Sequence, residues 1–147
     1  MVEILETIKA SISSGLRGEV RVPGDKSISH RALILGSLTI GETTVDGLLD
    51  SEDVLSTANA ISALGAKVYI KKPGICTIKG VGVGGFKEPD NIIDCGNSGT
   101  SARLLLGAVS TNPIKVTFTG DGSLRERPMD RVVVPLTKFG ATFSCNF

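Results

Sequence analysis

The spacing of hydrophobic residues predicts a chain of alternating helices and strands. Val54, Ala58 and Ile61 recur every three or four positions along one stripe, while polar residues occupy the other side. This pattern is typical of a helix that packs on a core. Gly65 follows the stripe and is a common residue at the end of a helix. The helices predicted in this way span residues 27–38, 53–64, 100–109 and 128–139.

Short apolar segments between these helices predict strands, because turn residues bound each of them. The clearest pair is separated by Pro73-Gly74, a dipeptide that favours a tight turn. The predicted strands span residues 18–22, 43–45, 67–70, 75–79 and 114–119, and a further one begins at 141.

The order of elements repeats along the chain, which indicates two related units. Leu64-Gly65-Ala66 has a counterpart in Phe139-Gly140-Ala141, which lies 75 residues later, and Arg31 has one in Arg103, which lies 72 residues later. Each unit is predicted to run strand-helix-strand-helix-strand-strand, and such units usually stack around a shared core. The second unit lacks its closing strands before Phe147, so we expect a fragment of a longer protein or a truncated reading frame.

Composition and charge exclude several functional classes. The 147 residues are 41% hydrophobic and 21% charged, which is typical of a globular domain. Sixteen basic and fifteen acidic residues give a net charge of +1, which argues against a nucleic-acid-binding protein. No stretch has the pattern of a signal peptide or the length of a membrane span, so we expect no membrane partner.

The three cysteines do not suggest a disulfide framework or a metal site. Their number is odd, no Cys-x-x-Cys occurs, and His30 is the only histidine. A zinc site of cysteine and histidine ligands is therefore not expected. We expect a reduced, cytoplasmic protein.

Three predicted helix starts carry cations where acidic side chains are the ordinary choice. The helix dipole favours negative charge at its N-terminus, as Glu52 and Asp53 provide for the helix at 53–64. In contrast, Lys26 lies at the first helix start, Arg103 in the first turn of the third helix, and Arg127 directly before the helix predicted to begin at Pro128. A bound anion would make this arrangement favourable, so the three starts predict a polyanion site.

Each of the three segments also has a simpler structural explanation. The first reads as a solvated helix start with a serine cap. The second reads as a tight strand-to-helix turn in which Gly96 and Gly99 give room and Thr100 caps the helix. The third reads as a surface loop whose arginines pair with Asp121 and Glu126.

Two other features resemble functional motifs, but their context argues against a functional role. Residues 80–85 match the dinucleotide pattern G-x-G-x-x-G, but Pro89 and its neighbours do not open a helix, so we interpret this segment as a flexible connection. His30 has no companion nucleophile and lies inside a helix pattern, which favours a packed or surface histidine over a catalytic one.

The three segments together resemble the 5-enolpyruvylshikimate-3-phosphate synthase family. Residues 22–32, 94–103 and 120–129 are similar to its signature loops in order and spacing. The resemblance covers the whole chain but only about a third of the family's length. It implies an α/β fold of repeated βαβαββ units, the enolpyruvyl transferase-like inside-out α/β barrel, here incomplete. It also implies that residues 1–22 start a first globule and that 23–147 form a partial second globule of about two units, the second truncated.

The resemblance further implies the reaction and the site. Enzymes of this family transfer the enolpyruvyl group of phosphoenolpyruvate to the 5-hydroxyl of shikimate 3-phosphate and require no metal or organic cofactor. The implied shikimate 3-phosphate contacts are Lys26, Ser27 and Arg31. The implied phosphoenolpyruvate contacts are Lys26, Asn97, Gly99, Thr100 and Arg127, with Arg103 supporting the loop.

The proton-transfer residues of the family lie in the later part of its chain. No catalytic residue is therefore expected here, and we expect no turnover by this polypeptide alone. Full-length members are monomeric, whereas unpaired strand edges lead us to expect self-association of this fragment.

Other interpretations stay open at the level of sequence. One is a non-catalytic anion-binding module, and another is a fragment of the related UDP-N-acetylglucosamine enolpyruvyl transferase. In the latter family the first loop resembles Gly-Ala-Lys-Asn where this chain has Gly24-Asp25-Lys26-Ser27. That family also carries a reactive cysteine in a mobile loop, and no cysteine here has a matching context.

Overall fold

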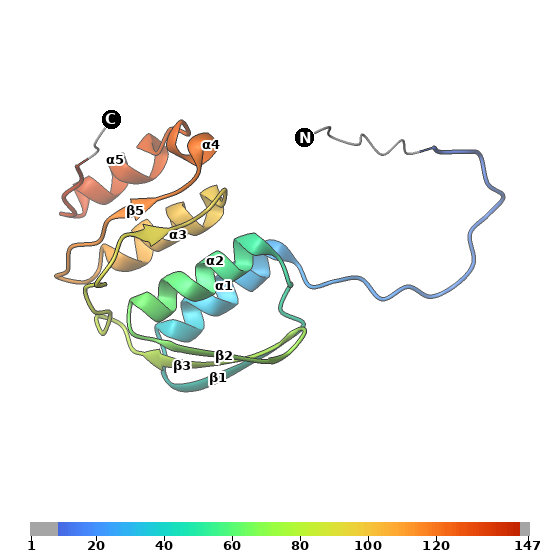
Figure 1. Cartoon of the computed structure of the whole chain (residues 1–147), viewed down its shortest axis with the longest axis horizontal. Helices are drawn as coiled ribbons and strands as arrows, with labels where there is room; N and C mark the ends of the chain where they lie inside the picture. Colours follow the sequence, from blue (N-terminus) through green and yellow to red (C-terminus); the bar gives the residue numbers. More distant parts are fainter. Residues whose placement is uncertain (1–8, 145–147) are drawn as a thin grey trace.

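A computed structural model describes residues 9–144 of the chain. Its first half contains α1, β1, α2, β2 and β3, and its second half contains β4, α3, β5, α4 and α5 (Figure 1). The bounds are α1 Lys26–Ser37, β1 Ile40–Asp46, α2 Glu52–Ala63, β2 Lys67–Lys72, β3 Ile75–Val81, β4 Ile93–Asp94, α3 Gly99–Val109, β5 Phe118–Thr119, α4 Gly122–Arg125 and α5 Asp130–Lys138.

The first half of the chain forms an antiparallel sheet in the order β1-β3-β2. Ile78 lies in the central strand and is flanked by Thr43 on β1 and Val68 on β2. The predicted hairpin is confirmed, with Gly74 in the turn at a φ of +80° that favours glycine. β1 is longer than the predicted 43–45 because it pairs with β3 along its whole length.

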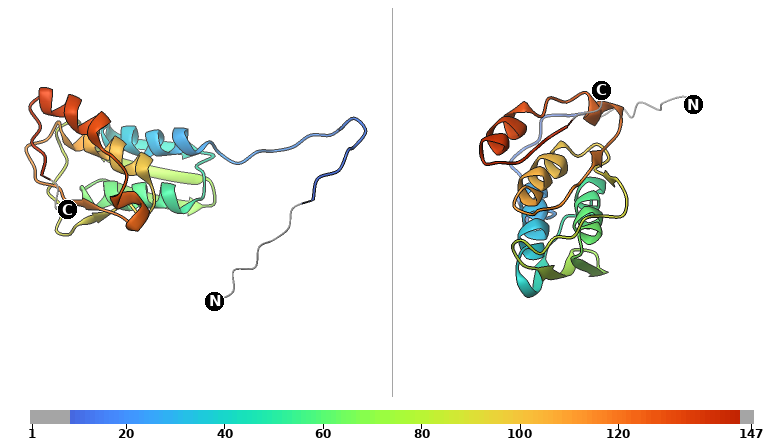
Figure 2. Two further views of the ribbon diagram at one scale, coloured as in Figure 1. Left: turned by 90° about the horizontal axis from the view of Figure 1, so that it is seen from above. Right: turned by 90° about the vertical axis from the view of Figure 1, so that its left-hand side faces the viewer.

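The helices stack on one side of this sheet in successive layers (Figures 1 and 2). α1 and α2 cover the sheet, α3 packs on α1 and α2, and α5 packs on α3. The core between the layers is aliphatic, as the scarcity of aromatic residues predicts. Each fully buried leucine or isoleucine contributes roughly 1.5–3 kcal/mol to folding. The completely buried hydrophobic side chains include Leu33, Val54, Ile61, Leu64 and Ile78.

The helix ends confirm the repeat that the sequence predicts. α2 closes at the C-cap Leu64, and Gly65 follows with a φ of +106°. α5 closes in the same way at Phe139, where Gly140 has a φ of +98°. Both glycines adopt the left-handed conformation that commonly ends a helix. α2 and α5 therefore occupy equivalent places in the two units.

The second unit begins with a strand-helix-strand crossover, in which β4 and β5 pair in parallel around α3. Each of these strands has only two residues, so the strand predicted at 114–119 is confirmed for 118–119 alone. The short helix α4 was not predicted. α5 begins at Asp130 rather than at Pro128, and the Pro128 carbonyl instead accepts a hydrogen bond from Arg103.

Two predicted strands are absent from the described residues. The strand at 18–22 is wrong: residues 9–23 form an extended arm that runs away from the helices (Figure 1). A strand requires a partner for its backbone groups, and no described segment pairs with this arm. Residues 141–144 also form no strand, and 145–147 lie outside the described residues. The division into a first globule at 1–22 and a second at 23–147 stays a prediction.

The glycine-rich segment at 80–85 allows the chain to pack closely against the end of α1. A side chain at Gly80 would overlap the carbonyl oxygens of Gly36 and Thr39, which close the end of α1. Gly82 and Gly84 both adopt positive φ, and no helix follows until α3. This segment is therefore not a phosphate-binding turn at a helix start. Between residues 9 and 144, no helix is both long enough and apolar enough to cross a bilayer.

Candidate anion-binding site

The N-terminal ends of α1, α2 and α3 meet at one end of the helical layers. Lys26, the first residue of α1, contacts Asp53 in the first turn of α2, with 2.8 Å between Nζ and Oδ2. Ser101, in the first turn of α3, donates a hydrogen bond to the main-chain oxygen of Asp53 at 3.2 Å. Because the first N–H groups of a helix lack intrahelical partners, three positive helix ends gather here.

The start of α1 leaves the predicted site residues free to face solvent. Its N-cap is Asp25, whose Oδ1 accepts a hydrogen bond from the Ile28 N–H at 2.7 Å. The expectation of a serine cap is therefore wrong. Lys26, Ser27 and Arg31 are exposed, and neither Ser27 nor Arg31 forms a side-chain hydrogen bond with another described residue. Their polar groups are available to a ligand.

The start of α3 is capped by Ser98, so the expected cap by Thr100 is wrong. The Ser98 hydroxyl accepts from the Ser101 N–H at 3.1 Å, and Thr100 is exposed. Gly96, just before the cap, has a φ of +55°, and its N–H donates to Asp94 Oδ1 at 2.8 Å. This tight turn brings the backbone of residues 96–99 to the end of the helical layers.

Parallel pairing of β4 and β5 places the third loop beside the start of α3. The Asp121 N–H donates to the Gly96 carbonyl at 2.9 Å. Asn97 donates through Nδ2 to Asp121 Oδ2 at 2.6 Å and accepts at Oδ1 from Arg127 Nη2 at 2.7 Å. Arg127 also donates to the Ser123 hydroxyl at 3.2 Å. Asp121, Asn97 and Arg127 thus form one hydrogen-bonded row across the two loops.

Asp121 serves to orient this row and does not pair with an arginine in a salt bridge. The Asn97 hydrogen bond, followed by the Leu124 N–H, lowers the pKa of Asp121. Arg127 bonds only to neutral oxygens among the described residues, and neither Arg125 nor Arg127 forms a salt bridge with them. The alternative of a surface loop whose arginines pair with Asp121 and Glu126 is therefore wrong. Arg127 lies between α4 and α5, three positions before Asp130, and not directly at a helix N-terminus.

Arg103 lies beneath the α3 start and joins it to the segment before α5. Its Nη1 donates to the Gly99 carbonyl at 3.3 Å, and its Nη2 donates to the Pro128 carbonyl at 3.1 Å. Desolvation, followed by the charges of Arg131 and Arg127, lowers the pKa of Arg103. Several guanidinium groups therefore lie close together, and within residues 9–144 none of them forms a salt bridge.

Sequence reasoning missed several polar residues that organise this region. Asp53 looked like an ordinary helix-start residue, yet it holds Lys26 across 27 positions of sequence. Asp121 looked like part of a surface loop, yet it orients Asn97. Thr57 and Ser101 carry no recognisable motif, because their contacts join separate helices.

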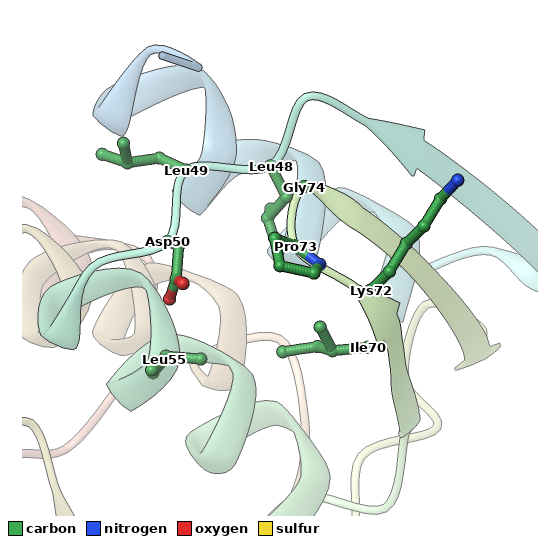
Figure 3. Close-up of a pocket in the computed structure, with 8 residues that line it drawn as sticks. All are labelled: Leu48, Leu49, Asp50, Leu55, Ile70, Lys72, Pro73 and Gly74. Carbon is green, nitrogen blue, oxygen red and sulfur yellow. The ribbon is translucent and has the colours of Figure 1, made fainter.

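Two cavities lie apart from the row of loop residues. One, of about 280 Å³, lies between the loop before α2 and the turn of the β2–β3 hairpin (Figure 3). Its lining includes Leu48, Leu55 and Ile70, and none of the predicted site residues. The other, of about 270 Å³, separates α1 from α3 and is lined by Arg31 together with apolar side chains. Of the predicted site residues, Arg31 alone lines one of these two cavities.

The chain matches one protein family along almost its whole length. The family model described as EPSP synthase (3-phosphoshikimate 1-carboxyvinyltransferase) matches residues 10–146. A relative named 3-phosphoshikimate 1-carboxyvinyltransferase from Ruegeria sp. (strain TM1040) is 60% identical over 129 residues, which are 88% of this chain and 29% of the relative. One with the same name from Jannaschia sp. (strain CCS1) is 62% identical over 125 residues, covering 85% of this chain and 28% of the relative.

A solved structure supports the same assignment. The EPSP synthase from Acinetobacter baumannii is 45% identical and matches with a TM-score of 0.81, covering 85% of this chain and 28% of that one. This likeness confirms the predicted α/β fold class. The chain thus spans less than a third of the length of these relatives. From its sequence, its fold and these matches, the chain belongs to the EPSP synthase (3-phosphoshikimate 1-carboxyvinyltransferase) family.

Proposed function

We propose that this chain supplies anion-binding groups for the transfer of the enolpyruvyl group of phosphoenolpyruvate to the 5-hydroxyl of shikimate 3-phosphate, with release of phosphate. The names of the relatives support this reaction. One observation carries the proposal for this chain: three helix N-termini converge beside cations that have few carboxylate partners. Such a region suits two substrates that are both polyanions.

The shikimate 3-phosphate contacts are proposed at the start of α1. Lys26 and Ser27 lie on its first turn, and Arg31 follows Ser27 by four residues, so these two side chains share one face of the helix. The ammonium, hydroxyl and guanidinium groups would together donate to a phosphate. Lys26 would exchange its exposed contact with Asp53 for the substrate, because an ion pair at the surface contributes little stability.

The phosphoenolpyruvate contacts are proposed at the start of α3 and in the loop after α4. Asn97, Gly99 and Thr100 surround the first turn of α3, and Arg127 reaches this turn through Asn97. Lys26 would contact this substrate as well. Arg103 would support the loop from beneath through its bonds to the Gly99 and Pro128 carbonyls.

These residues would act by positioning and by electrostatic stabilisation. The substrate hydroxyl loses its proton and attacks C2 of phosphoenolpyruvate as C3 gains a proton. The resulting tetrahedral intermediate then loses phosphate together with one C3 proton, which re-forms the C2–C3 double bond. Cations and helix ends offset the repulsion between the two substrates and hold them in reacting geometry. None of the proposed residues transfers the protons, so we expect no turnover by this polypeptide alone. We propose that the reaction uses no metal or organic cofactor and takes place in the cytoplasm.

Calorimetric titration of the 147-residue chain with shikimate 3-phosphate tests this proposal. We expect measurable binding that weakens roughly tenfold or more in Arg31→Ala, the loss expected for a hydrogen bond between charged groups. Lys67→Ala, which removes an exposed cation from β2 on the sheet, serves as the control and should bind like the unmodified chain. Absence of binding to the unmodified chain, or equal weakening by both variants, would refute the proposed role.

A further inference from the structure

A row of four buried polar side chains runs across the helical layers just behind the candidate site. His30 comes from α1, Thr57 from α2, and Ser101 and Ser98 from α3 and its cap. His30 Nδ1 lies 2.8 Å from Thr57 Oγ1, which lies 2.7 Å from Ser101 Oγ. Ser101 Oγ lies 2.6 Å from Ser98 Oγ. None of the four side chains is more than 3% exposed.

The surroundings of His30 determine which groups donate and which accept in this row. Its Nε2 is buried and has no hydrogen-bond partner among the described residues. A proton on Nε2 would leave a buried donor unsatisfied, at a cost of about 1–3 kcal/mol, whereas a buried acceptor without a partner is tolerated more often. The proton therefore belongs on Nδ1, which donates to Thr57. Thr57 then donates to Ser101, whose single hydroxyl proton is shared between Ser98 Oγ at 2.6 Å and the Asp53 carbonyl at 3.2 Å.

The two ends of this row adjoin the proposed substrate contacts. His30 lies one turn after Lys26 on α1, and Ser98 lies between Asn97 and Gly99. Midway along the row, the Asp53 carbonyl accepts from Ser101 at 3.2 Å, while the Asp53 carboxylate holds Lys26. The same first turn of α2 therefore contacts both the α1 start and the α3 start.

We propose that Thr57 is a positioning residue of the anion site, whose hydroxyl, held by His30, sets the α3 start at its distance from α1. This inference rests on the proposed function, since it concerns the placement of those substrate contacts. Apolar contacts between helices permit small sliding motions, whereas a directional hydrogen bond specifies one arrangement. Thr57 itself touches no substrate, because it is fully buried.

A test without any ligand uses the fact that His30 is the only histidine of the chain. Its ring nitrogen signals in ¹⁵N NMR spectra are therefore unambiguous. We expect the Nδ1–H form in the unmodified chain and in Thr57→Ser, and a shift toward the Nε2–H form in Thr57→Val. The amide signals of Gly99 and Ser101 should move in Thr57→Val and stay in place in Thr57→Ser. An Nε2–H imidazole in the unmodified chain, or unmoved amides in Thr57→Val, would overturn the proposal.

A second measurement titrates the same proteins with phosphoenolpyruvate. Thr57→Val should weaken binding roughly 3- to 30-fold, as expected for a residue that acts through a coupled network, and Thr57→Ser should restore it. Ser62→Ala is the matched control, because it removes a hydroxyl from the far end of the same helix, where Ser62 bonds to the Ala58 carbonyl. Equal affinities in Thr57→Val and the unmodified chain would overturn the positioning role.

The two measurements distinguish a failure of the proposed function from a failure of the positioning role of Thr57. If the unmodified chain does not bind phosphoenolpyruvate, the proposed function fails, while the imidazole and amide signals still decide whether Thr57 sets the helix start. If Thr57→Val does not fold, Ser101→Ala replaces it, because this change removes the next link of the row. Ser101→Ala should then move the Gly99 amide and leave His30 in the Nδ1–H form, and an unmoved Gly99 amide would contradict the proposal.

Discussion

Replacing Gly99 by alanine should weaken phosphoenolpyruvate binding without unfolding the chain. A Cβ atom at this position would lie 2.6 Å from Arg103 Nη1 and 3.1 Å from Arg127 Nη1. Ordinary contacts begin at 3.4 Å, so the Arg103 guanidinium has to move by about 0.8 Å and that of Arg127 by about 0.3 Å. One added methyl group therefore displaces two of the cations in the candidate site.

The substitution should change the stability of the chain little and its affinity for phosphoenolpyruvate much more. Alanine restricts the unfolded chain and thereby stabilises the protein by about 0.4–1 kcal/mol, because Gly99 does not need a positive φ. Loss of the 3.3 Å bond from Arg103 to the Gly99 carbonyl costs about 0.5–1.5 kcal/mol. The free energy of unfolding should thus change by less than about 1 kcal/mol. Binding should weaken on the order of 10- to 100-fold, because catalytic and binding groups tolerate displacements of this size poorly.

Gly107→Ala provides a matched control in the same helix. A Cβ atom there meets no other atom within 4 Å, so the change tests helix propensity alone. It should raise the free energy of unfolding by about 0.5–1 kcal/mol and leave affinity unchanged. Urea denaturation and calorimetric titration with phosphoenolpyruvate measure the two quantities. Normal affinity in Gly99→Ala, or equal loss of affinity in Gly107→Ala, would show that displacing the two guanidinium groups does not weaken binding.

Other expectations concern the loops, the buried groups and the state of association. Asn97→Ala should weaken phosphoenolpyruvate binding roughly tenfold, because it frees Arg127 from its 2.7 Å bond, and unchanged affinity in calorimetry would contradict this. Burial lowers the pKa of His30 from 6.5, so the folded chain keeps it neutral while the unfolded chain takes up a proton. The resulting stability is present above pH 6.5 and is lost as the pH falls, and urea midpoints that do not decrease in acid would count against it. Burial raises the pKa of the Cys95 thiol to about 11, so alkylation at pH 8 should spare it until urea is added, as peptide mass spectrometry can show. The exposed arm and the sheet edges should cause self-association, and a monodisperse monomer in light scattering would argue otherwise.

Local signals made most of the helices and the β2–β3 hairpin predictable from sequence. The stripe of Val54, Ala58 and Ile61 reports burial directly, and Gly65 marks the end of the same helix. The strand predicted at 18–22 failed because strand formation depends on a partner segment, which local sequence does not reveal. The short helix α4 was missed because four residues are too few for a periodic pattern.

The candidate site was predictable only in part. Its cations stood out because the sequence placed them at predicted helix starts, where the dipole disfavours them, although the structure puts only Lys26 at such a position. The residues that hold them were not apparent, since Asp53 reaches Lys26 across 27 positions and Thr57 reaches Ser101 across 44. Such contacts depend on how the helices pack, and no pattern within one helix reports them. The predicted N-cap residues were also wrong, because the helices begin earlier than expected and Asp25 and Ser98 cap them.

We propose that the starts of α1 and α3 and the loop after α4 form one anion site. Amide NMR signals recorded during titration with phosphoenolpyruvate test it most directly. For one site, the signals of Lys26, Gly99 and Arg127 should move together and fit a single dissociation constant, while those of the β1-β3-β2 sheet stay in place. Signals that move with different constants, or that move mainly in the sheet, would contradict it.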